Sequence, residues 1–490
     1  MDISSDVFSL SMEPLNLPSS ASVTDVPMHS VESSPVAAPR PLPPPKMALP
    51  PQPRIDKGKG KQPSLPTTQM QPSTSSKVSL LSQLRRLYGH DAQWTCKQQR
   101  EAVKVLVTLE KDVILALRTG IGKTAVAVIP SMVENGYTVI VVPLIALMED
   151  WKRRLTEMDI AFEHFKGKET PELQGRSNII LVSSDVAKYD HWKKCISRID
   201  RQRPVLRMII DEAHYYFTDL DFRSHAMANS FTLRHLPMQM VLMSGTIPPQ
   251  AEAYLRDQFI LQDPVVIRTW SVRMEIEYIR TENVKDVSSM ISKFQSLLEA
   301  YKKVEGWNEC DRYLVFTPFI EDGKKIAKAL NVEFYHANSK TDPITLEERR
   351  DIYSRWTRGH TEGLVATTAL AAGNDYPHVR IAAHLGNPFD MVTFVQQSGR
   401  AGRDGKTAVS LLIPKGKAMP KIDHGSQDLS GKLVMHKYVN PVEEEIVLPD
   451  GCLRQMMSRF LDGQSYTCGD FGDDCEECDI CCKGEKWKDL

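Results

Sequence analysis

Short apolar runs rich in Val, Ile and Leu recur along the chain from about Val78, and stretches with helical periodicity separate them. The first series comprises residues 112–117, 137–143, 178–184, 206–211 and 238–244. Runs that are apolar throughout, rather than alternating with polar residues, are typical of strands buried on both faces of a parallel sheet. This part of the chain is therefore predicted to be a parallel sheet with helices on both faces.

A second series of the same kind comprises residues 312–318, 332–337, 362–368, 380–386 and 407–413. Two consecutive series of similar size predict an α/β protein with two tandem doubly wound domains, which meet near residues 265–285. The pattern stops after about residue 415, and a cluster of cysteines follows. We expect domains over residues 79–270, 271–415 and 416–490.

The first 78 residues differ in composition from the rest. Fifteen of the 31 prolines lie within the first 72 residues, and Ser and Thr fill much of the remainder. Such a segment buries too little apolar surface to offset the entropy lost on ordering, so residues 1–78 are predicted to be a disordered tail. A solvated linker explains Lys57, Lys59 and Lys61 more simply than a nuclear-import signal or a nucleic-acid tether does.

Charge and cysteine content limit the class of protein. The formal net charge of −1 favours no partner, so any contact with nucleic acid must come from local patches. The N-terminus lacks the features of a secretion signal, and no apolar run approaches the roughly 18 residues that span a bilayer. We expect a soluble intracellular protein with no membrane partner, in which six of nine cysteines clustered after residue 450 indicate metal binding.

A glycine-rich loop follows the first predicted strand and opens a helix. It runs Thr119-Gly120-Ile121-Gly122-Lys123-Thr124. Its glycines let backbone N–H groups approach the phosphates of ATP, Lys123 would reach the β- and γ-phosphates, and Thr124 would hold Mg²⁺. Leu117 stands where the strict motif has glycine, so the loop alone is also compatible with a turn that has no function.

An acidic tetrad, Asp211-Glu212-Ala213-His214, follows another apolar run. At a strand end, Asp211 would lie beside the Mg²⁺ ion and Glu212 would orient and deprotonate the attacking water. An acidic strand end is common by itself, but in this order with the glycine loop it predicts a nucleotide hydrolase.

Two arginines, Arg400 and Arg403, lie in a run that begins at Gln396 and ends at Gly405. The guanidinium group is always charged and binds phosphate through a planar fork, which suits a triphosphate held between two domains. Hydrolysis of a nucleotide clasped in this way changes how the domains face each other, so the sequence predicts a motor that moves along a strand. The predicted catalytic residues are Lys123, Asp211, Glu212, Arg400 and Arg403.

Together these segments resemble superfamily 2 helicases, and the RecQ family in particular. Gln99 looks like the glutamine with which that family reads adenine, with Gln98 as an alternative register, and residues 142–150 resemble its segment that contacts the DNA backbone. Further similarities lie at Asp221-Phe222-Arg223, Tyr335-His336-Ala337, residues 365–375 and Pro377-His378-Val379-Arg380, and Gly399 to Gly405 matches GRAGRDG letter for letter.

The resemblance implies two RecA-like domains and ATP-driven movement 3′ to 5′ on single-stranded DNA with Mg²⁺. It also implies unwinding of branched duplex in recombination or repair, and a nuclear location. It adds Asp375 to the ATP site, and it assigns coupling or DNA contact to His214, Tyr216, Phe217, Arg223, Ser244, Thr246 and Gln396.

Two features depart from the family pattern. Ser244-Gly245-Thr246 replaces TAT in the motif that couples hydrolysis to unwinding, with hydroxyls kept at both ends. The aromatic-rich loop lacks its Trp, and Tyr216 and Phe217 lie there instead. These aromatic side chains either stack on bases or pack between domains, and the sequence favours neither alternative.

The cysteine cluster resembles the RecQ zinc module. Cys452-Leu453-Arg454-Gln455 is similar to its opening CRRQ, and Cys478-Asp479-Ile480-Cys481 to its CDNC. Four thiolates complete a tetrahedral zinc site, so we expect Cys452, Cys468, Cys478 and Cys481 as ligands, with Cys475 as the alternative to Cys468. The helix that carries Arg454 and Arg459 could face DNA.

The sequence ends at Leu490, soon after this cluster. The family's winged-helix domain is not expected here, so strand separation would be weak or would need a partner. An RNA helicase of the same superfamily is an alternative, and a nucleic-acid-binding clamp with little unwinding activity is another. Protein partners cannot be named from the sequence.

Overall fold

A computed structural model describes residues 79–167, 173–218, 233–339, 341–370, 376–415 and 451–482. The predicted tail over residues 1–78 lies outside the described residues, as do Arg223, Asp375 and residues 416–450.

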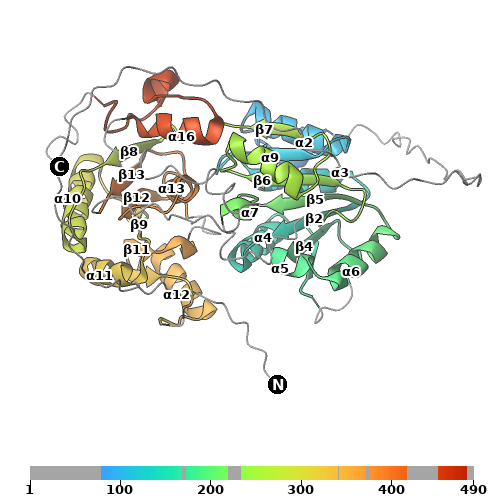
Figure 1. The fold of residues 1–490 in the computed structure, drawn as a ribbon, viewed down its shortest axis with the longest axis horizontal. Coiled ribbons are helices and arrows are strands. Elements are labelled where there is room, and N and C mark those ends of the chain that lie inside the picture. Colours follow the sequence, from blue (N-terminus) through green and yellow to red (C-terminus); the bar gives the residue numbers. More distant parts are fainter. Residues whose placement is uncertain are drawn as a thin grey trace, which may run out of the picture. The chain divides into compact units, whose positions relative to one another are not determined.

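The first half forms a seven-stranded sheet in the order β3-β4-β2-β5-β6-β1-β7, and every pair in it is parallel. Its strands are β1 (Val113–Ala116), β2 (Tyr137–Val142), β3 (Phe162–Phe165), β4 (Ile179–Ser183), β5 (Val205–Asp211), β6 (Gln239–Ser244) and β7 (Val265–Arg268). Its helices are α1 (Leu80–Tyr88), α2 (Lys97–Thr108), α3 (Lys123–Val133), α4 (Ile145–Glu157), α5 (Ser184–Ala187), α6 (Asp190–Asp200), α7 (Tyr215–Thr218) and α9 (Pro249–Gln258). Figure 1 shows this sheet with its blue and green helices.

Alternate residues of the central strands enter two different cores. On β1, Ile114 and Ala116 pack in one core, whereas Val113 and Leu115 pack in the other. Successive side chains of a strand point to opposite faces, so a strand buried on both faces must be apolar at every position. This is the physical basis of the apolar runs from which the sheet was predicted.

The second half forms a six-stranded parallel sheet in the order β10-β11-β9-β12-β13-β8. Its strands are β8 (Ile276–Arg280), β9 (Arg312–Phe316), β10 (Glu333–Tyr335), β11 (Gly363–Ala366), β12 (Val379–Leu385) and β13 (Ala408–Ile413). The helical segments are α10 (Val287–Glu305), α11 (Ile320–Leu330), α12 (Leu346–Thr357), η2 (Thr368–Leu370) and α13 (Met391–Ser398). Two tandem parallel-sheet domains, as predicted, are therefore confirmed.

The C-terminal part comprises α16 (Leu453–Asp462) and the 3₁₀ segment η3 (Cys468–Asp474). It packs against the edge strand β8 (Figure 1), where the backbone N–H of Asp479 donates to Tyr278 O at 3.0 Å. Arg454 is fully buried and donates to the backbone oxygens of Arg273, Ile276 and Glu476. The sequence left open whether Arg454 faces DNA. In the structure its side chain is buried and instead holds the C-terminal part against the second sheet.

Of the helices in the described ranges, none is both long enough and apolar enough to cross a membrane.

Candidate nucleotide site and cysteine cluster

The glycine-rich loop joins the end of β1 to the start of α3. Gly120 and Gly122 have φ values of 82° and 83°, a left-handed conformation that glycine adopts without strain. A Cβ atom on Gly122 would lie 2.6 Å from Nε2 of Gln99, so a side chain would also clash there. The loop thus presents backbone N–H groups and the N-terminus of α3, which together suit an anion such as phosphate.

Gln99 lies against this loop. Its side chain is 2% exposed, its Nε2 donates to Ile121 O at 2.9 Å, and its Oε1 accepts from Thr95 N at 2.9 Å. Gln98 is only partly buried. Of the two registers weighed from the sequence, the structure brings Gln99 to the loop.

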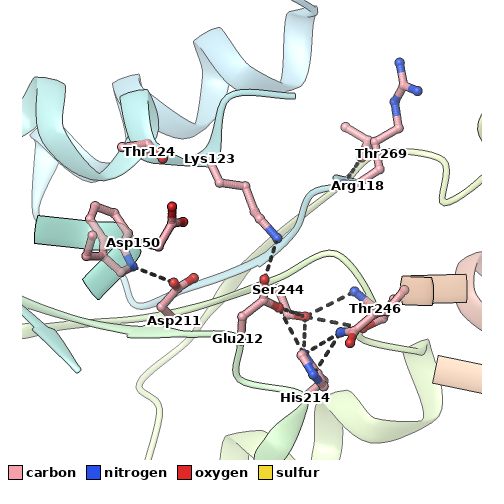
Figure 2. A network of polar contacts seen from close by, with 12 residues as sticks. Arg118, Lys123, Thr124, Asp150, Asp211, Glu212, His214, Ser244, Thr246 and Thr269 are labelled. Carbon is pink, nitrogen blue, oxygen red and sulfur yellow. Dashed lines mark hydrogen bonds and ion pairs between the residues drawn. The ribbon is translucent and has the colours of Figure 1, made fainter. Parts of the chain in front are cut away.

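The acidic tetrad begins at the last residue of β5. Glu212 accepts from Lys123 Nζ at 3.2 Å (Figure 2), and it has a φ of 44°, a conformation that non-glycine residues rarely adopt. Burial works against ionisation of Glu212, but the charges of Lys123 and His214 hold its pKa below the usual range. Burial and the charge of Glu212 raise the pKa of Asp211 to about 6.

Oxygen atoms for a hard divalent cation come from two elements. Asp211 offers a buried carboxylate at the end of β5, and Thr124 offers a buried hydroxyl at the start of α3. Carboxylate and hydroxyl oxygens are the donors that Mg²⁺ prefers, and Mg²⁺ is bound by one or two such groups together with substrate phosphates. The donor set therefore fits Mg²⁺ in company with a nucleotide.

A hydrogen-bond network extends from Glu212 to helix α13 of the second domain. His214 Nδ1 lies 2.8 Å from Ser244 Oγ, and Ser244 Oγ donates to Glu212 Oε2 at 3.1 Å. From α13, Gln396 Nε2 lies 2.8 Å from His214 Nε2 and donates to Thr246 Oγ1 at 3.1 Å. The network thus joins residues of both domains around the same carboxylate, and Figure 2 shows its members from the first domain.

The arginine-bearing turn that follows α13 lies against the glycine-rich loop. A Cβ atom on Gly399 would lie 3.1 Å from Thr119 Oγ1. Burial and the charge of Arg403 lower the pKa of Arg400 to about 10, and the charge of Glu212 opposes this. Arg403 Nε donates to Gly399 O at 3.5 Å. The structure thus brings Gly399, at the start of this turn, close to the glycine-rich loop of the first domain.

Sequence reasoning missed the residue that shapes this turn. Arg273, on the segment between the two sheets, is buried and donates to the backbone oxygens of Gly399, Ala401 and Gly402 at 2.9–3.2 Å. No motif of the sequence drew attention to Arg273. The buried Trp151, which donates to Asp211, was missed in the same way.

Tyr216 and Phe217 lie in the interior of the first domain. Each is 2% exposed, and the ring of Tyr216 packs edge-on against that of Phe259 with centroids 4.8 Å apart. Such positions favour packing over stacking on bases. The neighbouring Tyr215, whose ring centroid is 4.2 Å from that of His214, is the aromatic residue that adjoins the network.

Four cysteines of the C-terminal part converge. The sulfur atoms of Cys452, Cys468, Cys478 and Cys481 all lie within 4.8 Å of one another, and Cys475 is not a member of the group. The Sγ atom of Cys452 is 3.7 Å from that of Cys468 and 3.6 Å from that of Cys478. Zn–S bonds of about 2.3 Å in a tetrahedron place sulfurs about 3.8 Å apart, so the geometry fits zinc.

Residues 96–254 match the DEAD/DEAH box helicase family, and residues 292–405 match the helicase conserved C-terminal domain. The ATP-dependent DNA helicase Q5 of Rattus norvegicus is 25% identical over 438 residues, which are 82% of this chain and 43% of that protein. The ATP-dependent helicase SGS1 of Saccharomyces cerevisiae is 26% identical over 324 residues, 63% of this chain and 22% of that protein.

Two solved structures share the fold. S. cerevisiae Dbp5 bound to RNA and ADP BeF3 is similar with a TM-score of 0.52 and 17% identity, over 66% of this chain and 84% of that one. The DUF1998 helicase MrfA bound to DNA is similar with a TM-score of 0.52 and 19% identity, over 70% of this chain and 48% of that one.

The two RecA-like domains and the matched families define a helicase of superfamily 2. Within it, the chain belongs to the RecQ family, to which the similar DNA helicases belong. It spans less than half the length of these two relatives.

Proposed function

We propose that this protein is an ATP-driven motor that moves 3′ to 5′ on single-stranded DNA and unwinds branched duplexes during recombination or repair in the nucleus. The observation that carries the proposal is the network around Glu212, to which the second domain contributes Gln396 from α13. A nucleotide held at such a shared site links its own hydrolysis to the arrangement of the two domains.

Each residue has a role in this proposal. Lys123 binds the β- and γ-phosphates, and Thr124 and Asp211 hold Mg²⁺, which neutralises charge on the phosphates when bound. Glu212, ionised because of its low pKa, orients the attacking water and accepts its proton. Arg400 and Arg403 stabilise the charge that develops on the transferred phosphoryl group.

Nucleotide recognition and coupling involve further residues. Gln99 reads the adenine ring from its position beside the glycine-rich loop, and the backbone of residues 119–122 cradles the phosphates. His214, Ser244, Thr246 and Gln396 transmit the state of Glu212 to the second domain. The parts given to Asp375 in ATP binding and to Arg223 in DNA contact stay predictions from the family resemblance.

The domain limits stay as proposed from the sequence, at residues 79–270, 271–415 and 416–490. In the last of these, zinc held by Cys452, Cys468, Cys478 and Cys481 stabilises a part of the chain that is too small to form a large apolar core.

Strand displacement on forked substrates tests the proposal. We expect ATP-dependent displacement from a fork with a 3′ single-stranded tail, little from one with a 5′ tail, and none with the variant Glu212→Gln. Displacement confined to the 5′-tailed fork would overturn the direction of movement.

Parallel measurements of ATP turnover with single-stranded DNA and with RNA of the same sequence separate the two possible substrates. Stronger stimulation by RNA would favour the RNA-helicase alternative. Turnover without any displacement or translocation would favour the clamp.

A further inference from the structure

Helix α4 contacts both residues that the proposed function assigns to Mg²⁺. Trp151 Nε1 donates to Asp211 Oδ2 at 2.7 Å, and Arg154 Nη1 donates to Thr124 Oγ1 at 3.0 Å. Trp151 and Arg154 are three residues apart and thus lie on the same face of the helix. One face of α4 therefore contacts both oxygen atoms that the proposed function assigns as Mg²⁺ ligands. Figure 2 marks the hydrogen bond from Trp151 to Asp211.

The Trp151 contact is directional. The indole N–H is a donor only, so Trp151 cannot itself ligate a cation. Trp151 is 5% exposed and Asp211 is 6% exposed, so this hydrogen bond forms away from solvent. This hydrogen bond holds Oδ2 and thereby limits the rotation of the Asp211 carboxylate.

The Arg154 contact acts in the opposite sense. Its guanidinium group lies between Thr124 and Asp150, whose Oδ2 is 2.9 Å from Arg154 Nη2. A divalent cation bound to Thr124 would meet the positive charge of Arg154 at close range, and like charges repel strongly where water is partly excluded. When the hydrogen bond from Arg154 to Thr124 breaks, Arg154 retains its ion pair with Asp150.

We infer that α4 positions the Mg²⁺ site, with Trp151 orienting Asp211 for the metal and Arg154 restraining Thr124 until the metal enters. This inference rests on the proposed function. Trp151 and Arg154 are positioning residues, and they affect metal affinity with opposite signs: loss of the Trp151 hydrogen bond weakens metal binding, whereas loss of the Arg154 charge strengthens it.

The test measures metal binding without turnover. Isothermal titration calorimetry gives the affinity for ADP with and without Mg²⁺, and the ratio of the two affinities isolates the metal. Trp151→Phe should leave the affinity for ADP alone unchanged and reduce the Mg²⁺-dependent gain about tenfold, as expected for one hydrogen bond to a charged group. Trp151→Gln, which keeps a donor, should recover much of the gain, and Arg154→Met should increase it.

Trp192→Phe is the matched control, because Trp192 is buried in the same domain and its Nε1 has no hydrogen-bond partner among the described residues. A gain in Trp151→Phe equal to that of the unmodified chain would overturn the role of Trp151, and a reduced gain in Arg154→Met would overturn that of Arg154. If the unmodified chain shows no Mg²⁺-dependent gain at all, the proposed nucleotide site fails instead. Electron paramagnetic resonance of Mn²⁺ bound with ADP gives a second measurement of metal affinity. If Trp151→Phe does not fold, Arg154→Met still tests the inference through its expected increase in metal affinity.

Discussion

Gln396 Nε2 lies 2.8 Å from Nε2 of His214, although His214 follows β5 of the first sheet and Gln396 is on α13, beside the second sheet. His214 also lies 3.1 Å from Glu212 Oε2 through its Nδ1 atom, so one imidazole ring joins the second domain to the proposed catalytic carboxylate. Its immediate neighbour on that side is Ser244, whose hydroxyl donates to the same oxygen. The relationship makes the carboxylate sensitive to any movement of α13.

Gln396→Ala should therefore uncouple the domains without removing the nucleotide. We expect ATP binding to be unchanged and DNA-stimulated turnover to fall about tenfold, since one lost hydrogen bond of this kind costs about 1–2 kcal/mol. Phosphate release with and without single-stranded DNA measures the effect. Gln295→Ala, at an exposed position of α10, is the control, and stimulation of Gln396→Ala to the same level as this control would contradict the prediction.

Lys123→Ala and Arg403→Ala should separate binding from chemistry. Lys123 lies in the first turn of α3, beside Glu212. Because it is proposed to bind the β- and γ-phosphates, its loss should abolish nucleotide binding and turnover. Loss of Arg403 should leave binding largely intact and reduce turnover by about 10³-fold or more. Binding of a fluorescent ATP analogue and phosphate release distinguish the two steps, and circular dichroism verifies folding. Turnover like that of the unmodified chain in either variant would refute its assignment.

Cys468→Ser and Cys475→Ser should differ in zinc content. Cys468 lies 3.7 Å from Cys452 through their sulfurs, whereas the Cys475 thiol donates to the backbone oxygen of Glu476. We expect about one zinc per chain in the unmodified protein and in Cys475→Ser, and a large loss in Cys468→Ser. Elemental analysis of the purified chains decides between them. Zinc lost only from Cys475→Ser would exchange the two assignments.

Asp404 should stabilise the second domain in a pH-dependent way. Burial opposes its ionisation, but hydrogen bonds from Arg380 and from His378 lower its pKa to about 2. A carboxylate with a lower pKa in the folded state than in the unfolded state adds stability above the unfolded value near 3.8, and this contribution is lost as the pH falls towards 2.

The variant Asp404→Asn should therefore lower the free energy of unfolding by about 2 kcal/mol at pH 7. The difference from the unmodified chain should shrink to roughly half near pH 3. Urea unfolding at several pH values measures both quantities. A difference that does not change with pH would mean that packing, and not charge, accounts for the loss.

Ten of the strands were predicted from apolar runs, and the three that were missed share one property. β3, β7 and β8 are all edge strands, each at an end of its sheet. An edge strand has one neighbour instead of two and is often covered on fewer sides, so it need not be apolar at every position. Phe162–Phe165 has mixed polarity and is mostly half-buried, and β8 includes two charged residues and is covered at its outer edge by the C-terminal part.

Those parts of the candidate site that lie in recognisable sequence motifs could be predicted. The glycine-rich loop and the acidic tetrad have fixed spacings that follow from phosphate and metal chemistry, and the structure brings them together at Lys123 and Glu212. Trp151, Arg154 and Arg273 could not be found in this way. Each acts through a side chain that crosses from another element, and such contacts depend on how helices and strands pack, which spacing along the chain does not encode.

The contact of Arg454 with Arg273 joins residues 181 positions apart in the chain. During synthesis, β8 leaves the ribosome long before the guanidinium group that satisfies the backbone beside it. Until then the outer edge of the second sheet exposes unpaired peptide groups, which invite pairing with other chains. A nascent or truncated chain that stops before Cys452 should accordingly depend on chaperones to remain in solution, whereas the chain that reaches Cys481 closes this edge by itself.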